Sequence, residues 1–537
     1  MLSSTGAKAL DWEASADWGL DPFALVEAAG RACAGAFVHA LAGMRKKQEL
    51  SFAVLAGKGN NAADALVMLR ALILDGYAQS SVCLVVTPQV IVATAATAAS
   101  AEGKTPLSEA MLSVRKLGVP VMAWDAAETA AIAHTLTHYD VIIDGITGTG
   151  LTGPLRSPAL EMVEMVNAID RQSGHGSPDH PWIVSIDVPS GNFDGWQPGM
   201  PMIAAHTTLA LEPQKFCLYM PAARPHAGAI VPVGGIFPPA LIDKYPEAEL
   251  IGWEAASAKI PPIPPTAYKY ERGLVEIRAG SLGAAGAARL AALGAQAAGA
   301  GLVRLKVDPS LYPVIAPGCS GIMAVPDDAS VKAAENGRFS PDAALLGPGW
   351  GRGEDRMRLL ETYLPLEKSG LPLILDADAI VLAKDMTFNG NALLTPHPGE
   401  FAAYTGLSKE EILSRPIPAL RRFAAEKKAH ILLKGHVLYA ASPDGRIGVI
   451  DGMNPALAAG GSGDVLAGFC AAIAARSAVS GQKPFDGYAC ACAAASLLIQ
   501  AANSERIAGK FIDPAELAGA AAAIAGSAWL PKRGGIV

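Results

Sequence analysis

The sequence predicts two successive α/β domains, each built on a mostly parallel sheet with helices on both faces. At 537 residues the chain is too long for one ordinary hydrophobic core. Short apolar runs alternate with helical patterns in both halves, as in sheets whose parallel strands are joined by helices. Between the halves, the proline-rich stretch 260–265 can neither continue a helix nor form a central strand. We therefore expect one domain over residues 1–255, a linker over 256–268 and a second domain over 269–537.

The expected strands are short apolar runs, and the expected helices lie between them. In the first half, strands are expected at Phe52–Ala56, Val82–Val86, Val141–Asp144 and Ile183–Asp187, and helices at Ala62–Leu74 and Pro158–Ile169. In the second half, strands are expected at Leu274–Ile277, Ala343–Leu346, Leu371–Leu375, Ala392–Leu394 and Ile431–Leu433, and helices at Gly283–Ala298 and Val465–Ala475. The first half and the second half show no short internal repeat, so we expect two different domains.

Composition excludes several classes of protein. Hydrophobic residues make up 51% and charged residues 17%, which indicates a folded chain. The net charge of −7, without a basic patch, argues against nucleic-acid binding. The longest uncharged apolar runs, Tyr488–Ala502 and Leu517–Leu530, are shorter than the ~20 residues of a membrane span, so we expect no membrane association. Seven scattered cysteines without a CxxC pair, and a start unlike a signal peptide, predict a cytoplasmic protein without structural zinc.

The most informative segment is 459–468, a glycine-rich turn that runs into an apolar helix. Gly460, Gly461, Ser462 and Gly463 form a candidate phosphate-binding loop, because glycines let backbone N–H groups converge on an anion at a helix N-terminus. A carboxylate is repelled by a phosphate beside it, so Asp464 is not expected to bind the phosphate. We interpret Asp464 as a base that takes the proton of a hydroxyl attacking phosphorus. The alternative is a tight turn in which Asp464 only caps the helix.

Other loops of the second half also follow expected strands. Small residues over 280–287 and 347–351 allow a ligand to approach closely, but they also suit plain helix packing. Asp376 and Asp378 could orient a substrate, hold a cation or cap the next helix. His397 lies in a constrained turn that we expect to face a pocket. Lys434 ends a strand, where a lysine can face a nucleotide phosphate or simply lie at the surface.

In the first half, polar side chains come directly after the expected strands. Asn60 and Asn61 follow the strand 52–56, Asp144 and Asp187 end two others, and Ser190 comes soon after Asp187. Open α/β sheets bind ligands beyond the carboxyl ends of their strands, so these loops can converge. Their oxygens suit a weakly held cation better than zinc, and Asp187 can act as an acid–base group. Taken singly, each residue could merely form a turn.

Together these segments resemble the NAD(P)H-hydrate epimerase domain, whose pattern is GxGNNGGDG, DAxxGTGLxG and DVPSG. The chain has Gly57-Lys58-Gly59-Asn60-Asn61-Ala62-Ala63-Asp64-Ala65, Asp144-Gly145-Ile146-Thr147-Gly148-Thr149-Gly150 and Asp187-Val188-Pro189-Ser190-Gly191. The resemblance implies a Rossmann-like three-layer α/β fold, K⁺ held by Asn61, Asp144 and Ser190, and Asp187 as the acid–base residue. It also implies that a hydrated nicotinamide nucleotide lies across Asn60, Asn61, Ala62, Ala63, Asp64, Gly148, Thr149, Gly150, Leu151, Thr152, Gly153 and Pro154.

The chain departs from this pattern where Ala62-Ala63-Asp64-Ala65 replaces Gly-Gly-Asp-Gly. If those glycines require a positive φ, each alanine costs about 1 kcal/mol and distorts the loop. If they lie in the first helical turn, alanine is favoured. The added methyl groups could also crowd a phosphate or the ribose. The first domain is therefore either an active epimerase or a domain that binds the nucleotide without catalysis.

The second half, from about Lys269 to Leu517, resembles the ADP-dependent NAD(P)H-hydrate dehydratase of the ribokinase-like superfamily. The resemblance is carried by Gly299-Ala300-Gly301-Leu302-Val303, GPGxG at Gly347, DADA at Asp376, TPHPGE at Thr395, KG at Lys434 and GGSGD at Gly460. It implies a ribokinase-like α/β domain in which Lys434, Gly435, His436, Val437, Leu438 and Gly463 contact ADP or ATP. It further implies that Ala285, Gly349, His397 and Asp464 line the hydrate site. A late His-Gly pair of the family is not found near Ile499-Gln500.

These resemblances imply repair of nicotinamide nucleotides. The second domain would dehydrate (6S)-NAD(P)H hydrate to NAD(P)H with Mg²⁺, converting ADP to AMP and phosphate, while the first domain interconverts the R and S hydrates. The expected partners are small molecules, namely hydrated NADH or NADPH and ADP, and we expect a homo-oligomer. One alternative is a ribokinase-like small-molecule kinase with a degenerate nucleotide-binding first domain, which leaves the first-half motifs unexplained. A nucleotide-binding scaffold is another, and it leaves the Asp464 loop unexplained.

Overall fold

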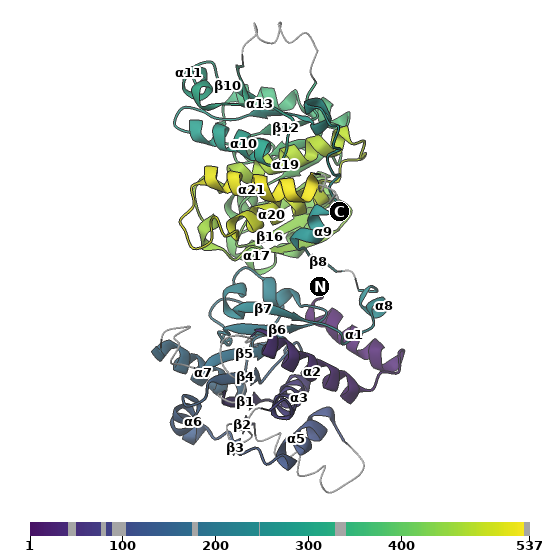
Figure 1. Cartoon of the computed structure of the whole chain (residues 1–537), viewed down its shortest axis with the longest axis vertical. Helices are drawn as coiled ribbons and strands as arrows, with labels where there is room; N and C mark the ends of the chain where they lie inside the picture. Colours follow the sequence, from purple (N-terminus) through teal and green to yellow (C-terminus); the bar gives the residue numbers. More distant parts are fainter. Residues whose placement is uncertain are drawn as a thin grey trace, which may run out of the picture. The chain divides into compact units, whose positions relative to one another are not determined.

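The computed structural model of the chain describes residues 1–40, 50–76, 82–87, 104–173, 181–245, 247–327 and 340–530. The chain folds into two compact units, Met1–Glu247 and Ala248–Val537. Each unit is built on one main sheet that carries helices on both faces (Figure 1). The predicted fold class, two α/β domains, is confirmed.

The described part of the first unit contains a seven-stranded sheet in the order β3-β2-β1-β4-β5-β6-β7, with parallel neighbours. The order reverses between β1 and β4, which is the switch point of a doubly wound, Rossmann-like sheet. Ligands of such sheets bind beyond the carboxyl ends of the strands at this point. The strands are β1 (Phe52–Ala56), β2 (Val82–Val86), β3 (Val121–Ala123), β4 (Val141–Gly145), β5 (Trp182–Ile186), β6 (Thr207–Leu211) and β7 (Ala229–Val233).

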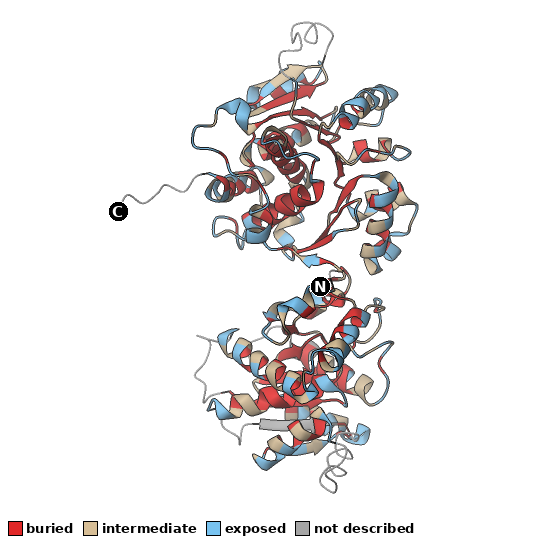
Figure 2. Ribbon diagram, turned by 90° about the vertical axis from the view of Figure 1, so that its right-hand side faces the viewer, coloured by how far each residue is buried: buried red, intermediate tan, exposed pale blue. Residues whose placement is uncertain are grey.

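Helices cover both faces of this sheet, and alternate strand residues face opposite layers. Phe52 and Val54 pack into the cluster under α2, α3 and α5, whereas Ala53 and Leu55 pack under α6 and α7. Figure 2 shows buried strands between helices whose outer sides are exposed. Helix α1 packs separately, through Leu10, against Leu241 of α8. The helices are α1 (Ser4–Ala16), α2 (Pro22–Ala40), α3 (Asn60–Leu74), α5 (Pro106–Lys116), α6 (Thr129–Leu136), α7 (Ala159–Ser173) and α8 (Pro239–Ile242).

The described part of the second unit contains a ten-stranded sheet in the order β11-β10-β9-β12-β13-β14-β15-β16-β17-β8. Strands β9 to β15 of this sheet pair in parallel, and β15, β16 and β17 form an antiparallel meander. The strands are β8 (Glu249–Leu250), β9 (Leu274–Arg278), β10 (Leu302–Val307), β11 (Met323–Pro326), β12 (Ala343–Leu346), β13 (Leu373–Leu375), β14 (Ala392–Leu394), β15 (His430–Leu433), β16 (Val437–Ala441) and β17 (Ile447–Asp451).

Helices α10 and α19 form the centre of one helical layer of the second unit, and two glycines bring them together. A Cβ at Gly294 would lie 2.3 Å from the carbonyl oxygen of Val465, and a Cβ at Gly468 would lie 2.2 Å from that of Ala291. The helices are α9 (Trp253–Ser257), α10 (Ala285–Ala297), α11 (Tyr312–Ile315), α13 (Glu354–Glu361), α14 (Leu364–Lys368), α15 (Asp378–Leu382), α16 (Pro398–Thr405), α17 (Lys409–Ser414), α18 (Pro416–Lys427), α19 (Ser462–Val479), α20 (Gly487–Ala502) and α21 (Pro514–Trp529).

By length and composition alone, α19 is long and apolar enough to cross a membrane. In the structure, however, 72% of this helix is buried inside the second unit. It therefore behaves as the core helix of a folded domain, and its small residues are explained by its packing against α10.

The predicted elements are found where the sequence placed them. Strands β1, β2, β12 and β14 have the predicted bounds, and the other predicted strands and helices are displaced at their ends by a few residues at most. The proline-rich segment 256–268 differs from the expected linker, because it lies inside the second unit and the chain divides after Glu247. Ile260 and Ile263 are buried in the core of this unit, and the Ile263 N–H donates to the Trp529 carbonyl oxygen at 2.8 Å.

Candidate active sites

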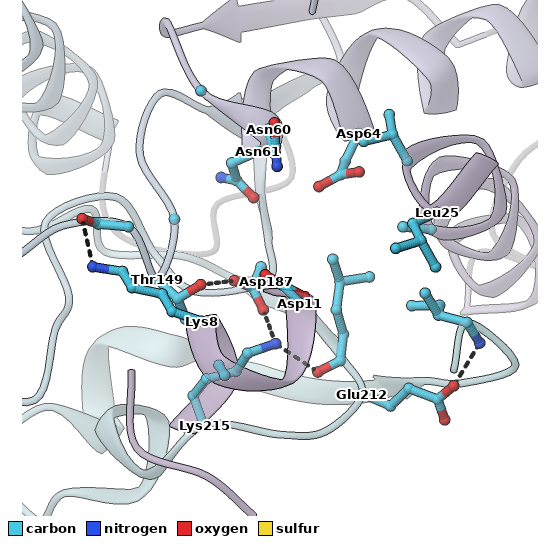
Figure 3. A pocket seen from close by; sticks show the side chains of 18 of the residues that line it. Lys8, Asp11, Leu25, Asn60, Asn61, Asp64, Thr149, Asp187, Glu212 and Lys215 are labelled. Carbon is cyan, nitrogen blue, oxygen red and sulfur yellow. Dashed lines mark hydrogen bonds and ion pairs between the residues drawn. The ribbon is translucent and has the colours of Figure 1, made fainter. Parts of the chain in front are cut away.

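The first unit has a cavity of about 540 Å³ beyond the carboxyl ends of β1, β4, β5 and β6 (Figure 3). Helices α1 and α2 complete its wall. The predicted site residues that line it are Asn60, Asn61, Asp64, Gly148, Thr149, Gly150 and Asp187. The predicted residues Ala62, Ala63, Leu151, Thr152, Gly153 and Pro154 are not among its lining residues.

Asp187 is the central carboxylate of this cavity. It directly follows β5 and has a φ of 65°, which is uncommon for any residue except glycine and typical of functional sites. Lys215, at the end of the loop after β6, places its Nζ 2.6 Å from Asp187 Oδ1, and both side chains are buried. The Thr149 hydroxyl donates to Asp187 Oδ2 at 3.3 Å. The lysine and the hydroxyl therefore fix the direction in which this carboxylate points.

A group of buried oxygen atoms lies beside the cavity. Asp144 is fully buried and accepts hydrogen bonds from the Ser190 hydroxyl and N–H, from Ser185 and from the backbone N–H of Ile146. Burial raises the pKa of the Asp144 carboxyl above its ordinary value, against the lowering by these donors. Asn61 donates through Nδ2 to the Thr147 carbonyl oxygen at 3.0 Å, while its buried Oδ1 has no hydrogen-bond partner in the described part of the chain. Asn61, Asp144 and Ser190 are thus brought together, as predicted.

The altered segment Ala62-Ala63-Asp64-Ala65 forms the first turns of α3, and its three alanines are fully buried. None of these alanines has a positive φ, and their methyl groups point away from the cavity into the core under α2 and α3. Asp64 alone faces the cavity. Burial, with the charge of Asp187, raises the pKa of the Asp64 carboxyl well above its ordinary value.

The methyl group that Ala65 adds is accommodated by a glycine elsewhere in the chain. A Cβ at Gly145, at the end of β4, would lie 2.6 Å from the Ala65 Cβ, so only one of these two positions can carry a methyl group. The epimerase pattern has glycine at the first position and alanine at the second, whereas this chain has alanine at 65 and glycine at 145. The exchange keeps the volume between α3 and β4 constant.

In the second unit, the predicted residues also gather at the carboxyl edge of the sheet. Lys434, after β15, places its Nζ 2.6 Å from Asp376 Oδ1, after β13. The Thr395 hydroxyl, after β14, donates to the same Asp376 oxygen at 2.7 Å. A Cβ at Gly463 would lie 3.5 Å from Lys434 Nζ, so the glycine loop reaches this ion pair. Three strand ends and the N-terminus of α19 therefore meet around Lys434.

Asp464 lies in the first turn of α19, and its surroundings favour the protonated form more than water does. Burial and the charges of Asp376 and Glu400 raise the pKa of the Asp464 carboxyl to about 6, while Lys434 acts in the opposite direction. A carboxylate with such a pKa is a stronger proton acceptor than an ordinary aspartate and is still mostly ionised at neutral pH. The geometry and the charges of this edge suit a general base.

Glycines bring the remaining loops of this edge together. Gly461, the residue before α19, has a φ of 102°, and Ser462 hydrogen-bonds back to the carbonyl oxygens of Leu457 and Ala459. Gly349 has a φ of 54°, and a Cβ there would lie 2.8 Å from the Ala284 Cβ. The Gly349 loop therefore lies against the start of α10, which is also where Ala285 is found.

Several other predicted residues have structural contacts. His397 precedes α16, and its Nδ1 accepts from the N–H groups of Gly399 and Glu400 as a helix cap. Asp378 accepts from the Gly351 N–H at 2.8 Å and pairs with Arg352, so it holds the glycine loop after β12. Asp376 and Asp378 thus face different partners.

The predicted nucleotide-contacting residues run from the end of β15 into β16. Gly435 and His436 are exposed between the two strands, whereas the side chains of Val437 and Leu438 are buried in the core. The sequence did not identify Lys215 and Asp11, which both line the first cavity. Lys215 follows a strand end at Leu211, which is the signal that could have identified it.

The comparisons with known proteins cover both units. The family model described as NAD(P)H-hydrate dehydratase matches residues 275–519, and the model described as YjeF-related protein N-terminus matches residues 22–217. The bifunctional NAD(P)H-hydrate repair enzyme Nnr of Salinibacter ruber is 30% identical over 528 residues, which are 94% of this chain and 92% of that protein. The enzyme of the same name from Thermofilum pendens is 31% identical over 484 residues, which are 87% of this chain and 86% of that protein.

Among solved structures, the chain is similar to an ADP/ATP-dependent NAD(P)H-hydrate dehydratase from Bacillus subtilis that was co-crystallized with ATP and Mg²⁺. The identity is 26%, and the match covers 53% of this chain and 99% of that one, with a TM-score of 0.45. A ribokinase-like superfamily protein from Enterococcus faecalis matches with 22% identity over 53% of this chain and 98% of that one, with a TM-score of 0.47.

The contact between Ala65 and Gly145 predicts a coupled effect on stability. Gly145→Ala alone should destabilise the full chain by about 1–3 kcal/mol, because it overpacks the space between α3 and β4. Ala65→Gly combined with Gly145→Ala should recover most of this loss. Urea unfolding of the two single variants and the double variant measures the coupling. Gly153→Ala, where a Cβ meets nothing within 4 Å, is the control. Strictly additive effects of the two substitutions would contradict the proposed contact.

Proposed function

This chain belongs to the family of bifunctional NAD(P)H-hydrate repair enzymes, and we propose that both of its units are catalytic. The first unit epimerises the R and S hydrates of NADH and NADPH, and the second dehydrates the S hydrate at the expense of ADP. This conclusion is supported by the matches to both family models, which cover residues 22–217 and 275–519. A small-molecule kinase or a scaffold accounts for neither the pair of matches nor the two lysine–carboxylate sites.

The dehydration begins with activation of the hydrate's hydroxyl group on carbon 6. Asp464 accepts the hydroxyl proton while the oxygen attacks the terminal phosphorus of ADP, which releases AMP. The N–H groups of the loop Gly460, Gly461, Ser462 and Gly463 stabilise the charge on the transferring group. The phosphate then leaves carbon 6, pushed by the ring nitrogen, and loss of a proton from carbon 5 restores the reduced nicotinamide.

Lys434 and the nucleotide complete the second site. The Lys434 ammonium, held by Asp376 beside Gly463, lies where it can neutralise charge on the nucleotide phosphates. Ala285, Gly349 and His397 are proposed to contact the hydrate, and 434–438 the adenine nucleotide. Mg²⁺ would supply further charge neutralisation. The described residues hold no cluster of three His, Cys, Asp or Glu side chains that could bind it, so we propose that nucleotide phosphates supply most of its ligands.

In the first unit, we assign the acid–base chemistry at carbon 6 to Asp187. It forms an ion pair with Lys215, and it faces the cavity beside Thr149. The alanines at 62, 63 and 65 leave the cavity free, which supports an active epimerase rather than a degenerate binding domain. Asn60, Asn61, Asp64, Gly148, Thr149 and Gly150 supply further contacts to the nucleotide.

We further propose that Asn61, Asp144 and Ser190 hold K⁺ beside this cavity. The buried Asn61 Oδ1, which lacks a hydrogen-bond donor in the described part of the chain, is the observation that supports it. Carboxylate, hydroxyl and amide oxygens form a donor set that suits such a cation. When bound, K⁺ would supply a fixed positive charge near the nucleotide phosphates. We also propose that the protein works in the cytoplasm as a homo-oligomer, without nucleic acid or membrane.

The role of Asp464 predicts both a large loss of activity and a defined pH dependence. Asp464→Asn should lower the dehydration rate by about 10²–10⁴-fold, because no base then takes the hydroxyl proton. In the unmodified protein, the rate should fall as the pH drops through about 6, since protonated Asp464 cannot accept a proton. Recovery of absorbance at 340 nm from hydrated NADH and ADP measures both effects.

Glu400→Gln tests the cause of this pH dependence. Removing the Glu400 charge should lower the pKa of Asp464 and move the acid limb to lower pH, while glutamine can still accept from the His397 N–H. Glu410→Gln, an exposed change on α17, should leave the profile unchanged. An acid limb that stays in place or moves to higher pH in Glu400→Gln would contradict the assignment.

The proposed K⁺ site predicts ion-specific stabilisation of the protein. K⁺ should raise the thermal unfolding midpoint more than Li⁺ at equal ionic strength, because an ion that binds only the folded state stabilises it. Asn61→Leu should remove this difference, whereas Asn60→Ala, on the same turn but exposed, should preserve it. Equal midpoints of the unmodified protein in K⁺ and Li⁺ would refute the site.

A further inference from the structure

We propose that Asp11, on helix α1, is the second acid–base residue of the first unit's cavity and works opposite Asp187. The proposal rests on the role of Asp187 proposed above. Inversion at carbon 6 of the hydrate needs one group that removes a proton and another that supplies one. The structure offers a carboxyl group for each task, from two different walls of the same cavity.

Helix α1 presents one largely exposed face to the cavity. Lys8, Asp11, Trp12 and Ser15 all line it, and their spacing of three or four residues places them on one face of the helix. The opposite side is anchored, because Leu10 and Ala14 are buried against α8. The Ser3 side chain caps the helix by accepting from the Gly6 N–H. Asp11 is therefore held at the cavity by a packed element rather than by a free end of the chain.

The family match does not include this helix. The matched segment of the first unit begins at residue 22, whereas α1 ends at Ala16. The assignment of Asp11 therefore comes from the cavity itself, where α1 closes the side that faces the strand ends.

Asp11 and Asp187 have different electrostatic surroundings around one lysine. Lys215 forms its ion pair with Asp187, and Figure 3 shows Asp11 beside this pair. Although Asp11 is an exposed residue, partial desolvation and the Asp187 charge raise its pKa to about 6, against the lowering by Lys215. Asp11 is thus protonated more readily than an ordinary aspartate, while Asp187 forms the ion pair with Lys215.

The other charged side chains at the cavity differ from Asp11 in their burial or in their hydrogen bonds. Asp64, whose pKa burial also raises, is only 6% exposed, whereas Asp11 is exposed, so Asp11 is the carboxyl group that a substrate reaches more readily. Glu212 accepts from the N–H groups of Ile236 and Phe237, and Lys8, on the same helix as Asp11, donates to the Gly150 carbonyl oxygen at 3.3 Å. Among the described residues at the cavity, Asp11 and Asp187 are left to exchange protons with a substrate.

The two residues can invert carbon 6 by opening and closing the ring. The Asp187 carboxylate removes the proton of the hydroxyl group, the electron pair forms a C6=O bond, and the N1–C6 bond breaks. Asp11 gives its proton to N1, which leaves an aldehyde and an N–H group. After rotation about the C5–C6 bond, N1 attacks the other face of the aldehyde. Asp11 recovers its proton from N1 and Asp187 returns its proton to the oxygen, so both groups regain their starting states.

The test compares variants of the full chain by separating the R and S hydrates without ADP, so that only epimerisation is observed. Asp11→Asn should lower the epimerisation rate by about 10²-fold or more. Asp11→Glu, which keeps the acid, should retain part of the rate. Asp17→Asn, which removes an exposed carboxylate just after the same helix and outside the cavity lining, should have the rate of the unmodified protein. Dehydration with ADP should be unchanged in all three variants, which reports that the chain is intact.

A second readout separates proton transfer from a merely structural role. In the unmodified protein, epimerisation should decline as the pH rises through the pKa of Asp11, and the residual activity of Asp11→Asn should lack this decline. Thermal unfolding of Asp11→Asn shows whether the first unit remains folded. If this variant unfolds, the rate and the pH profile of Asp11→Glu are measured in its place.

Asp187→Asn distinguishes the possible failures. If Asp187→Asn abolishes epimerisation but Asp11→Asn does not, the role of Asp187 stands and that of Asp11 is wrong. If neither substitution slows epimerisation, both assignments fail. An unchanged pH profile in a folded Asp11→Asn variant would likewise overturn the proposal.

Discussion

Each of the two sites depends on an ion pair between a lysine and a buried aspartate that directly follows a parallel strand. Lys215 and Asp187 in the first unit, and Lys434 and Asp376 in the second, have the same separation of 2.6 Å between Nζ and Oδ1. Removing one partner would leave an uncompensated buried charge, which is costly. Such a pair therefore fixes the loops that carry it, and the other functional groups are oriented relative to it.

The two pairs leave different groups available for chemistry. In the second unit, Lys434 and Asp376 satisfy each other, and Asp464 is the nearby carboxylate whose pKa is raised by burial to about 6. In the first unit, the strand-end carboxylate Asp187 faces the cavity itself, and Asp11, an accessible carboxyl with a raised pKa, comes from a helix. In both, desolvation and a neighbouring carboxylate raise the pKa of a carboxyl group to about 6, and the lysine limits the shift.

Much of the fold and part of the sites could be predicted from the sequence. Continuous apolar runs such as Phe52–Ala56 and Ala343–Leu346 mark buried parallel strands, and their ends locate Asp187, Asp376 and Lys434. Strand β10 was not predicted, because Arg304 and Lys306 alternate with its apolar residues; both are buried beside Glu276, with Lys306 Nζ 3.2 Å from Glu276 Oε2. The sequence around Asp11 does not indicate that this residue lines a cavity, since only the tertiary fold shows which face of α1 meets the cavity. The effect of Ala65 likewise needed its neighbour Gly145, which lies 80 positions away in the chain but in contact in space.

Both units of this chain are proposed to act on one pool of substrate. The most direct test follows absorbance at 340 nm as the protein meets a mixture of R and S hydrates of NADH with ADP, Mg²⁺ and K⁺, over a time in which spontaneous epimerisation is slow. If both units are active, all the NADH is recovered, because the first unit converts the R hydrate into the form that the second unit consumes. Recovery that stops at the share of one epimer would contradict it, and would mean that the first unit binds the nucleotide without turning it over.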